Sequence, residues 1–297
     1  MEPRLQRRVQ RYGWDLAAAA YEPLWQSQLA PAHYALLNAT ALAPGERVLD
    51  VACGTGLVTL RAARGVFPGG QAVGTDLSGR MVEAAERAAA RHGVGNARFV
   101  RMDAERLDLS AASFDATLCA LGLMYLPHPE RAMREMRRVL RAGGRAVVAV
   151  WGLRSRCGWA PVFPIVDAEV ESDVCPLFFS LGTEGALSRL CLDAGFAPVD
   201  EQRIAATLSY ADADDACNAA FAAGPAALAW SRFADPVRKR VRARYLDAIE
   251  PWKRGRGYAL PGEFVVAAAK APDQGVGEGE DSRAARIASL NDHTADA

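Results

Sequence analysis

Three aspartates each follow a short apolar run of strand-forming residues. Asp50 ends Arg47-Val-Leu-Asp, Asp76 ends Val73-Gly-Thr-Asp, and Asp103 follows Phe99-Val-Arg-Met. The carboxyl ends of parallel strands share one edge of a sheet, where open α/β folds bind their ligands. We therefore expect the three carboxylates to face one crevice. Because carboxylates accept hydrogen bonds from amines and hydroxyls, the pattern indicates a ligand that carries both kinds of group.

The residues after Asp50 read Val-Ala-Cys-Gly-Thr-Gly56, and helical apolar spacing begins at Leu57. A strand, a tight glycine turn and a helix N-terminus hold a nucleotide-like ligand against bare backbone. The dinucleotide fingerprint is broken, because Ala52 and Leu57 occupy two of its glycine positions. A carboxylate at Asp50 would repel a pyrophosphate but attract an ammonium group. S-adenosylmethionine (SAM), with its amino-acid end, ribose and adenine, is therefore the expected ligand.

This segment resembles motif I of the class I SAM-dependent methyltransferases, in particular the small-molecule branch related to ubiquinone/menaquinone C-methyltransferases (methyltransferase type 11). The resemblance runs from about residue 44 to 151 and returns near 263–270. Asp76 lies at the spacing expected for a ribose-binding acid, and the resemblance implies that Asp103 binds adenine. The expected SAM-binding residues, with S-adenosylhomocysteine as product, are Asp50, Ala52, Cys53, Gly54, Gly56, Asp76, Leu77, Met81, Asp103, Ala104, Glu105 and Cys119.

Aromatic residues gather in the segments that should cover this edge of the sheet. We expect a lidded, mostly apolar pocket for a hydrophobic small molecule. Its expected substrate-binding residues are Tyr21, Trp25, Tyr125, Trp151 and Phe178. Methyl transfer from a sulfonium chiefly requires alignment and exclusion of water. A general base is needed only where the acceptor must first lose a proton. No catalytic residue is assigned, and His128, between two prolines, is read as part of a turn.

Apolar strands alternate with helices along the chain, which is typical of a parallel sheet covered on both faces. The expected fold is a Rossmann-like, doubly wound, seven-stranded mixed sheet with an antiparallel last strand and a helical cap insertion. One helix should run from Pro129 to the double glycine at 143–144. The expected divisions are an N-terminal helical lid segment (1–43), the SAM-binding core (44–152), a substrate-shaping cap with part of the sheet (153–250), a closing strand (251–270) and a disordered tail (271–297).

Composition limits the class of protein and of partner. Lys plus Arg and Asp plus Glu each number 35, so a net charge of zero gives no electrostatic case for nucleic acid or an anionic membrane. No apolar run could span a bilayer, and the N-terminus lacks the apolar core of a secretory signal. The six cysteines show no C-x-x-C spacing. Reduced thiols in a cytoplasmic protein without a bound metal are therefore expected.

Three other functions share this fold. A SAM-binding protein could act as a cyclase or regulator without transferring methyl. A nucleic-acid methyltransferase is disfavoured, because Cys119-Ala-Leu-Gly122 replaces the motif with which such enzymes clamp a base. Cys157 and Cys175 raise the idea of an arsenite methyltransferase, although their sequence contexts do not match. The residues leave open the acceptor's identity, the methylated atom, the use of a base and the oligomeric state.

Overall fold

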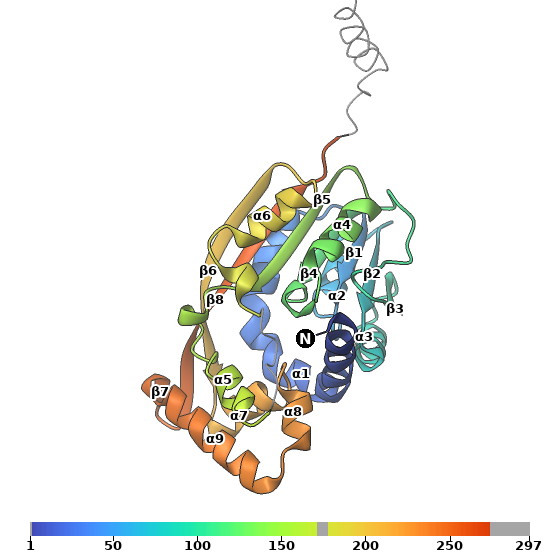
Figure 1. Ribbon diagram of the computed structural model, residues 1–297. Helices are drawn as coiled ribbons and strands as arrows, with labels where there is room; N and C mark the ends of the chain where they lie inside the picture. The colour runs from blue at the N-terminus through green and yellow to red at the C-terminus, as the bar shows by residue number, and fades with distance from the viewer. Residues whose placement is uncertain (1, 171–177, 274–297) are drawn as a thin grey trace, which may run out of the picture.

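The structure, a computed structural model, describes residues 2–170 and 178–273 and consists of one mixed sheet between layers of helices (Figure 1). The strands follow the order β3-β2-β1-β4-β5-β8-β6, and a two-residue β7 pairs with β8 beside this path. Their bounds are β1 Arg47–Val51, β2 Gln71–Asp76, β3 Ala97–Arg101, β4 Phe114–Ala120, β5 Leu140–Trp151, β6 Val199–Tyr210, β7 Lys253–Arg254 and β8 Gly257–Lys270.

The first five strands pair in parallel, whereas β8 is antiparallel to both β5 and β6. This confirms the expected mixed sheet with an antiparallel last strand. The strand order reverses at β1, since β2 lies on one side of it and β4 on the other. Ligands of open α/β sheets bind outside the carboxyl ends of the strands at such a reversal. The loops after β1, β2, β3 and β4 are therefore placed to form a site.

The core lies on both faces of the sheet, as strands without an exposed face require. Val48 and Leu49 are both fully buried and belong to different hydrophobic clusters, as do Val147 and Val148 of β5. One cluster joins the sheet to α2 and α3, and the other joins it to α4 and α6. The helices that cover these faces are α2 Thr59–Gly65, α3 Gly79–Arg91, α4 Pro129–Val139 and α6 Ala186–Asp193.

The N-terminal segment forms a single helix, α1 Pro3–Thr40. Glu2 caps it, because its carboxylate accepts hydrogen bonds from the backbone N–H groups of Arg4 and Leu5. The helix contacts α3 and α8 and also β5, β6 and β8. It therefore reaches from the ligand edge of the sheet to its covered face. The helical character expected for the N-terminal segment is found over Pro3–Thr40.

The cap is built from the chain after β5, together with the helices between β6 and β7, which gather at the lower end of the molecule in Figure 1. Its helices are α5 Val162–Asp167, α7 Ala213–Phe221, α8 Ala227–Arg232 and α9 Asp235–Ile249. Short 3-10 turns are η1 Leu123–Tyr125, η2 Arg154–Arg156, η3 Ser180–Gly182 and η4 Glu250–Trp252. Most of the tail expected to be disordered lies outside the described residues.

One expected boundary is wrong. Helix α4 ends at Val139, before the double glycine, because Leu140 already has extended backbone and pairs with Phe114 of β4. The next pair is Ala116 with Arg145, so residues 141–144 form an irregularity in which the glycines lie. A Cβ on Gly144 would come within 3.0 Å of the Asp115 carbonyl oxygen. The double glycine therefore serves the strand pairing and does not end the helix. None of the helices in the described part of the chain is long and apolar enough to cross a membrane.

Candidate cofactor and acceptor site

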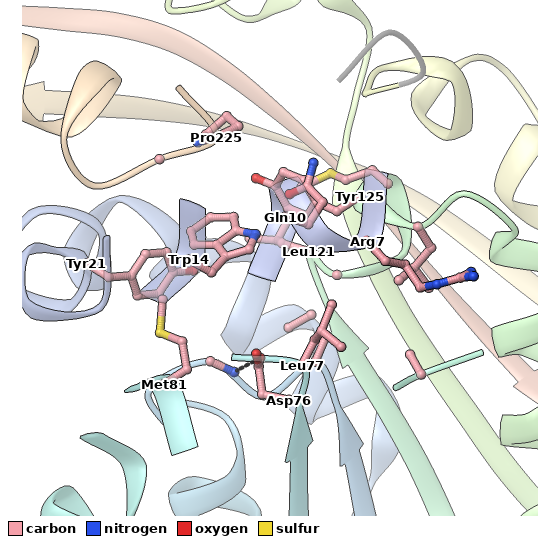
Figure 2. A pocket seen from close by; sticks show the side chains of 18 of the residues that line it. Arg7, Gln10, Trp14, Tyr21, Asp76, Leu77, Met81, Leu121, Tyr125 and Pro225 are labelled. Carbon is pink, nitrogen blue, oxygen red and sulfur yellow. Dashed lines mark hydrogen bonds between the residues drawn. The ribbon is translucent and has the colours of Figure 1, made fainter. Parts of the chain in front are cut away.

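A cavity, open at its mouth, lies at the carboxyl ends of β1 to β5. Its walls come from α1, from the loops after β1, β2, β3 and β4, and from the cap. Figure 2 shows Trp14 and Gln10 of α1 on one side and Asp76 and Leu77 on the other. Segments far apart in sequence thus enclose one space beneath α1.

The glycine loop brings bare backbone to this cavity. Ala52, Gly54 and Gly56 have φ angles of 56°, 54° and 85°, in the left-handed region that favours glycine. A Cβ on Gly56 would lie 3.1 Å from atoms of Ala85 and Phe99, so the loop also packs closely on α3 and β3. Ala52 and Gly54 line the cavity, whereas the buried Cys53 and Gly56 do not. Two of these four expected cofactor-binding residues thus reach the cavity.

Asp76 lies at the end of β2 and joins the cavity wall to the glycine loop. Its Oδ2 accepts a hydrogen bond from the N–H of Gly54 at 2.9 Å (Figure 2). Its Oδ1 accepts one from the N–H of Ser78 at 2.8 Å. Each oxygen keeps a second lone pair for a ribose hydroxyl. Burial raises the pKa of Asp76 to about 6. Leu77 and Met81 line the cavity beside it, as expected for an adenine pocket.

Asp50 lies beneath the glycine loop and is not part of the cavity wall. It is 1% exposed, and its Oδ2 accepts a hydrogen bond from the Thr59 hydroxyl at 2.6 Å. Its buried Oδ1 has no hydrogen-bond partner within residues 2–170 and 178–273. Burial raises the pKa of Asp50 to about 7. Such a carboxylate suits a nearby ammonium group, although direct contact with the cofactor remains a prediction.

The two acidic residues expected after β3, Asp103 and Glu105, have different positions relative to the cavity. Asp103 and Ala104 line the cavity, whereas Glu105 does not. Arg7 of α1 lies 3.0 Å from Glu105 and 3.7 Å from Asp103, measured between the charged atoms. Glu105 also accepts a hydrogen bond from the backbone N–H of His128 at 3.2 Å. Glu105 thus joins α1 to the loop before α4, and Asp103 remains the acid that faces the cavity.

The loop after β4 presents Ala120, Leu121 and Gly122 to the cavity, whereas Cys119 is buried behind them. Burial raises the pKa of the Cys119 thiol to about 12. A Cβ on Gly122 would lie 2.5 Å from that of Ala52, so the loops after β1 and β4 meet here in direct contact. Gly122 has no side chain, and only this lets the two loops come so close together.

Aromatic side chains form the other end of the cavity. Tyr21, Trp25, Tyr125 and Trp151 line it, as expected. Phe178 does not, but its ring packs on those of Tyr125 and Trp159, with centroids 5.3 and 5.5 Å apart. Further lining residues were not among the expected site residues. They are Arg7, Gln10, Trp14, Leu29, Met102, Ala120, Leu121, Gly122, Met124, Leu126, Pro127, Trp159, Gly224 and Pro225.

A signal for several of these lay in the sequence. Positions 7, 10, 14, 21 and 25 follow helical spacing, so they share one face of α1, and all of them line the cavity. Polar contacts hold this half of α1 over the cavity. Asp15 accepts a hydrogen bond from the Ser78 hydroxyl at 2.6 Å, and Gln6 donates one to the Tyr125 carbonyl at 3.3 Å.

The cysteines give no support to an arsenic site. Cys157 is buried, with its sulfur 3.9 Å from the Glu263 carbonyl oxygen, and Cys175 lies outside the described residues. Within the described ranges, no three His, Cys, Asp or Glu residues are grouped so that they could hold a metal.

Comparison with known proteins agrees with this geometry. Residues 48–144 match the family model described as a methyltransferase domain. A 113-residue stretch is 40% identical to the ubiquinone/menaquinone biosynthesis C-methyltransferase UbiE of Ectopseudomonas mendocina, covering 38% of this chain and 44% of that protein. UbiE of Pseudomonas fluorescens is 42% identical over 105 residues, covering 35% and 41%. The expected resemblance to methyltransferases is thus confirmed over residues 48–144. The chain spans less than half the length of these curated relatives.

Solved structures share the fold over a longer stretch. A crystal structure described as a candidate methyltransferase from Bacillus halodurans superimposes with a TM-score of 0.59 and 19% identity, covering 81% of this chain and 98% of that chain. The [4+2]-cyclase SpnF superimposes with a TM-score of 0.54 and 23% identity, covering 81% and 80%. At these identities the likeness concerns the fold alone.

Proposed function

We propose that the protein is a SAM-dependent methyltransferase that transfers a methyl group to a hydrophobic small molecule. One observation carries the proposal. A single cavity joins an end built from the glycine loop, Asp76 and Asp103 to an end walled by Tyr21, Trp25 and Trp151. The first end fits a ligand that carries an amine and hydroxyls. The second end fits an apolar acceptor.

The residues of the cofactor end fit SAM on structural grounds. The left-handed loop at Gly54 offers backbone at the cavity wall, and Asp76 keeps lone pairs for the ribose. Within the described residues the buried Oδ1 of Asp50 has no hydrogen-bond partner, and a positive charge near it would favour the ionised carboxylate. When bound, SAM supplies a methyl group on a positively charged sulfur. The chain's own contribution is to bind it and to aim it at the acceptor end.

Alignment and exclusion of water are the catalytic effects that this cavity can supply. Holding two reactants in line can contribute about 7–11 kcal/mol to lowering a barrier. The N-terminal half of α1 covers the cavity, and Trp14 packs edge-on against Tyr21 and Tyr125, with centroids 5.7 and 5.1 Å apart. Burial raises the pKa of the Tyr21 hydroxyl above its ordinary value, which makes it a poor base at neutral pH. We assign no general base.

The acceptor class rests on the walls of the cavity and on the relatives. The curated relatives carry the name of a C-methyltransferase of ubiquinone and menaquinone biosynthesis. The family-model match of 48–144 does not reach most of the aromatic wall, because Trp25 and Trp159 lie outside it. We therefore propose an apolar organic acceptor without naming the relatives' substrate for this chain.

The decisive experiment measures cofactor binding and product separately. Calorimetry should give a SAM complex, and mass spectrometry should find S-adenosylhomocysteine after incubation with apolar phenols and quinols. Failure of SAM to bind to the folded protein would refute the proposal. Binding without S-adenosylhomocysteine, but with a rearranged acceptor, would favour the cyclase-like alternative, since the cyclase SpnF shares the fold.

The proposal extends to partners and location. A neutral chain with a small apolar cavity fits a cytoplasmic enzyme of small molecules without a nucleic-acid partner. Cell fractionation tests the location, and a gel-shift assay with tRNA at low salt tests the exclusion of nucleic acid. A shift at micromolar protein would contradict it.

A further inference from the structure

One face of the first half of α1 is apolar and yet exposed to solvent. Leu5, Tyr12 and Leu16 are 43%, 47% and 53% exposed. Val9 lies between them at helical spacing, and these four residues form the apolar stripe of α1. The opposite face of the same helical turns lines the cavity. This half of α1 therefore has two contact faces, and the described part of the chain covers only one of them.

The apolar stripe continues onto α8. Leu228 of α8 lines a groove together with the first three residues of the stripe, and a second hollow together with the last two. The two helices are in contact here, because a Cβ on Gly13 would lie 3.7 Å from that of Leu228. Single exposed apolar side chains are common, whereas a continuous apolar patch marks an interaction site.

Arginines surround this patch. Arg8 and Arg232 line the groove, and Arg80 and Arg232 line the second hollow. The guanidinium of Arg11 lies over the tyrosine ring of the stripe, 4.6 Å from its centroid. Arg80 is paired with Glu83 at 3.0 Å. The other three arginines form no ion pair with any residue in the ranges 2–170 and 178–273.

The acidic residues beside the patch do not cancel its positive charge. Asp15 accepts hydrogen bonds from the Ser78 hydroxyl at 2.6 Å and from the backbone N–H of Arg80 at 3.3 Å. Glu83 lies between Arg80 and Arg87, at 3.0 and 4.0 Å. Three unpaired guanidinium groups thus exceed the single charge of Asp15. The zero net charge of the whole chain does not offset this excess, because charges more than about 8 Å away are largely screened at physiological salt.

We infer that the apolar stripe docks on the surface of an anionic lipid bilayer, with the first half of α1 lying along the interface. Leucine and tyrosine beside arginine are typical of helices that lie there. The arginine stems can follow the apolar surface while their charged ends reach the lipid phosphates. A second copy of the chain fits less well, since it would bring the same unpaired arginines against each other. The inference goes beyond the proposed function and does not depend on methyl transfer.

The test is co-sedimentation of the full chain with lipid vesicles, without SAM. One set of vesicles contains equal amounts of phosphatidylglycerol and phosphatidylcholine, and the other contains phosphatidylcholine alone. The wild-type protein should bind the anionic vesicles about 10-fold more tightly than the neutral ones, and added salt should weaken this binding. Equal binding to both sets, or binding to neither, would overturn the inference.

One triple variant removes the charges and a second removes the apolar side chains. Arg8→Gln/Arg11→Gln/Arg232→Gln should bind the anionic vesicles about 100-fold more weakly, as expected for three arginines at such a surface. Leu5→Ser/Tyr12→Ser/Leu16→Ser should bind about 10-fold more weakly, because less apolar area enters the interface. Unchanged binding by either variant would contradict the docking surface.

Matched controls carry the same kinds of change elsewhere on the molecule. Leu192→Ser alters a leucine of α6 that is 52% exposed, and it should bind like the wild-type protein. A second control loses three exposed arginines of β3 and α4 and should keep most of the binding: Arg98→Gln/Arg131→Gln/Arg134→Gln. SAM affinity and urea unfolding should stay close to wild type in the two test variants, because the altered side chains line no part of the cavity.

Hydrogen exchange with the anionic vesicles locates the contact. Backbone amides of residues 3–16 and of α8 should exchange more slowly, whereas those of α6 should keep their rates. Protection elsewhere would overturn the inference. So would a dimer in sedimentation equilibrium that the triple serine variant dissociates, since the stripe would then belong to a contact between copies. These outcomes leave the proposed function untouched, because SAM binding and S-adenosylhomocysteine formation are measured without lipid.

Discussion

The two ends of the cavity are built in different ways. The cofactor end comes from one continuous stretch, residues 52 to 104, whose cavity-lining residues lie at the carboxyl ends of β1, β2 and β3 or shortly after them. The acceptor end brings together α1 and, more than a hundred residues later in the chain, the end of β5 and the cap. The cofactor end is polar and held by backbone hydrogen bonds, whereas the acceptor end is aromatic. The proposed cofactor is thus bound by local backbone geometry, and the proposed acceptor by side chains packed together from distant segments.

The similarity to relatives also differs between the two ends of the cavity. The family match covers residues 48–144, which contain the cofactor end, and leaves out Trp25, Trp151 and Trp159. The fold, in contrast, extends over 81% of the chain in the structure from Bacillus halodurans. The scaffold therefore continues where sequence likeness stops. Selectivity for the acceptor should depend on the residues that the match omits.

The largest expected effect tests whether buried charge governs the cofactor end. Burial raises the pKa of Asp50 from 3.8 to about 7, so the folded protein keeps this proton where the unfolded chain has lost it. Its contribution to stability is therefore present at low pH and is lost as pH rises through about 7. Between pH 5 and 8, without SAM, the wild-type protein should lose about 2–3 kcal/mol more than Asp50→Asn.

Urea unfolding of both proteins at the two pH values measures this difference. Asp193→Asn, an exposed change on α6, serves as the control and should follow the wild-type protein. Parallel pH profiles of Asp50→Asn and the wild-type protein would contradict a raised pKa of the Asp50 carboxyl in the folded protein.

The second prediction concerns the ribose-binding acid. Asp76→Ala removes the acceptor that holds Gly54 and faces the cavity, so SAM affinity should fall by about 1–3 kcal/mol. Binding of an apolar acceptor such as 2-naphthol should be retained, because the acceptor end is built separately. Calorimetry measures both quantities, with Asp193→Ala as the control. An unchanged SAM affinity would remove Asp76 from the cofactor site.

A third change probes the border between the two ends. In Gly122→Ala the new methyl group would lie 2.5 Å from the Cβ of Ala52 and 2.9 Å from the sulfur of Cys119, so one loop must move. We expect a loss of about 1–2 kcal/mol in unfolding free energy, together with weaker binding at both ends. Gly95→Ala is the matched control, because no atom lies within 4 Å of a Cβ there. Equal stability of the two variants would show that the loops are not in contact.

The smallest expected effect concerns the contacts that hold α1 over both ends. Arg7→Gln removes a half-buried ion pair with Glu105, which should cost about 0.5–1 kcal/mol. SAM should dissociate about 2-fold to 5-fold faster by stopped-flow fluorescence. Arg98→Gln, an exposed change on β3, should leave the rate unchanged. A dissociation rate independent of Arg7 would show that α1 does not limit release.

What the sequence could predict follows the same division. The strands, the left-handed glycine loop and the cavity-facing Asp76 and Asp103 depend on local patterns, and the structure contains them at the expected places. The burial of Asp50 and Cys119 depends on which loop lies above them, and spacing does not show this. The contact between the Trp25 and Trp159 rings, whose centroids are 5.8 Å apart, depends on tertiary packing between distant segments. Helical spacing along α1 also indicates Arg7, Gln10 and Trp14, which the expected site residues leave out.

Helix α1 performs two tasks at its two ends. Ala32 and Leu36 are fully buried and anchor its second half in the core. Its first turns are held mainly by Gln6, Arg7 and Asp15 through polar contacts of modest individual strength. Fraying from the N-terminus can therefore uncover the cavity at a cost of a few kcal/mol, while the sheet stays intact. Such a cost corresponds to an open population of about 0.1–10%. Under the proposed function, partial unwinding of this helix would be enough to let a ligand enter or leave the cavity.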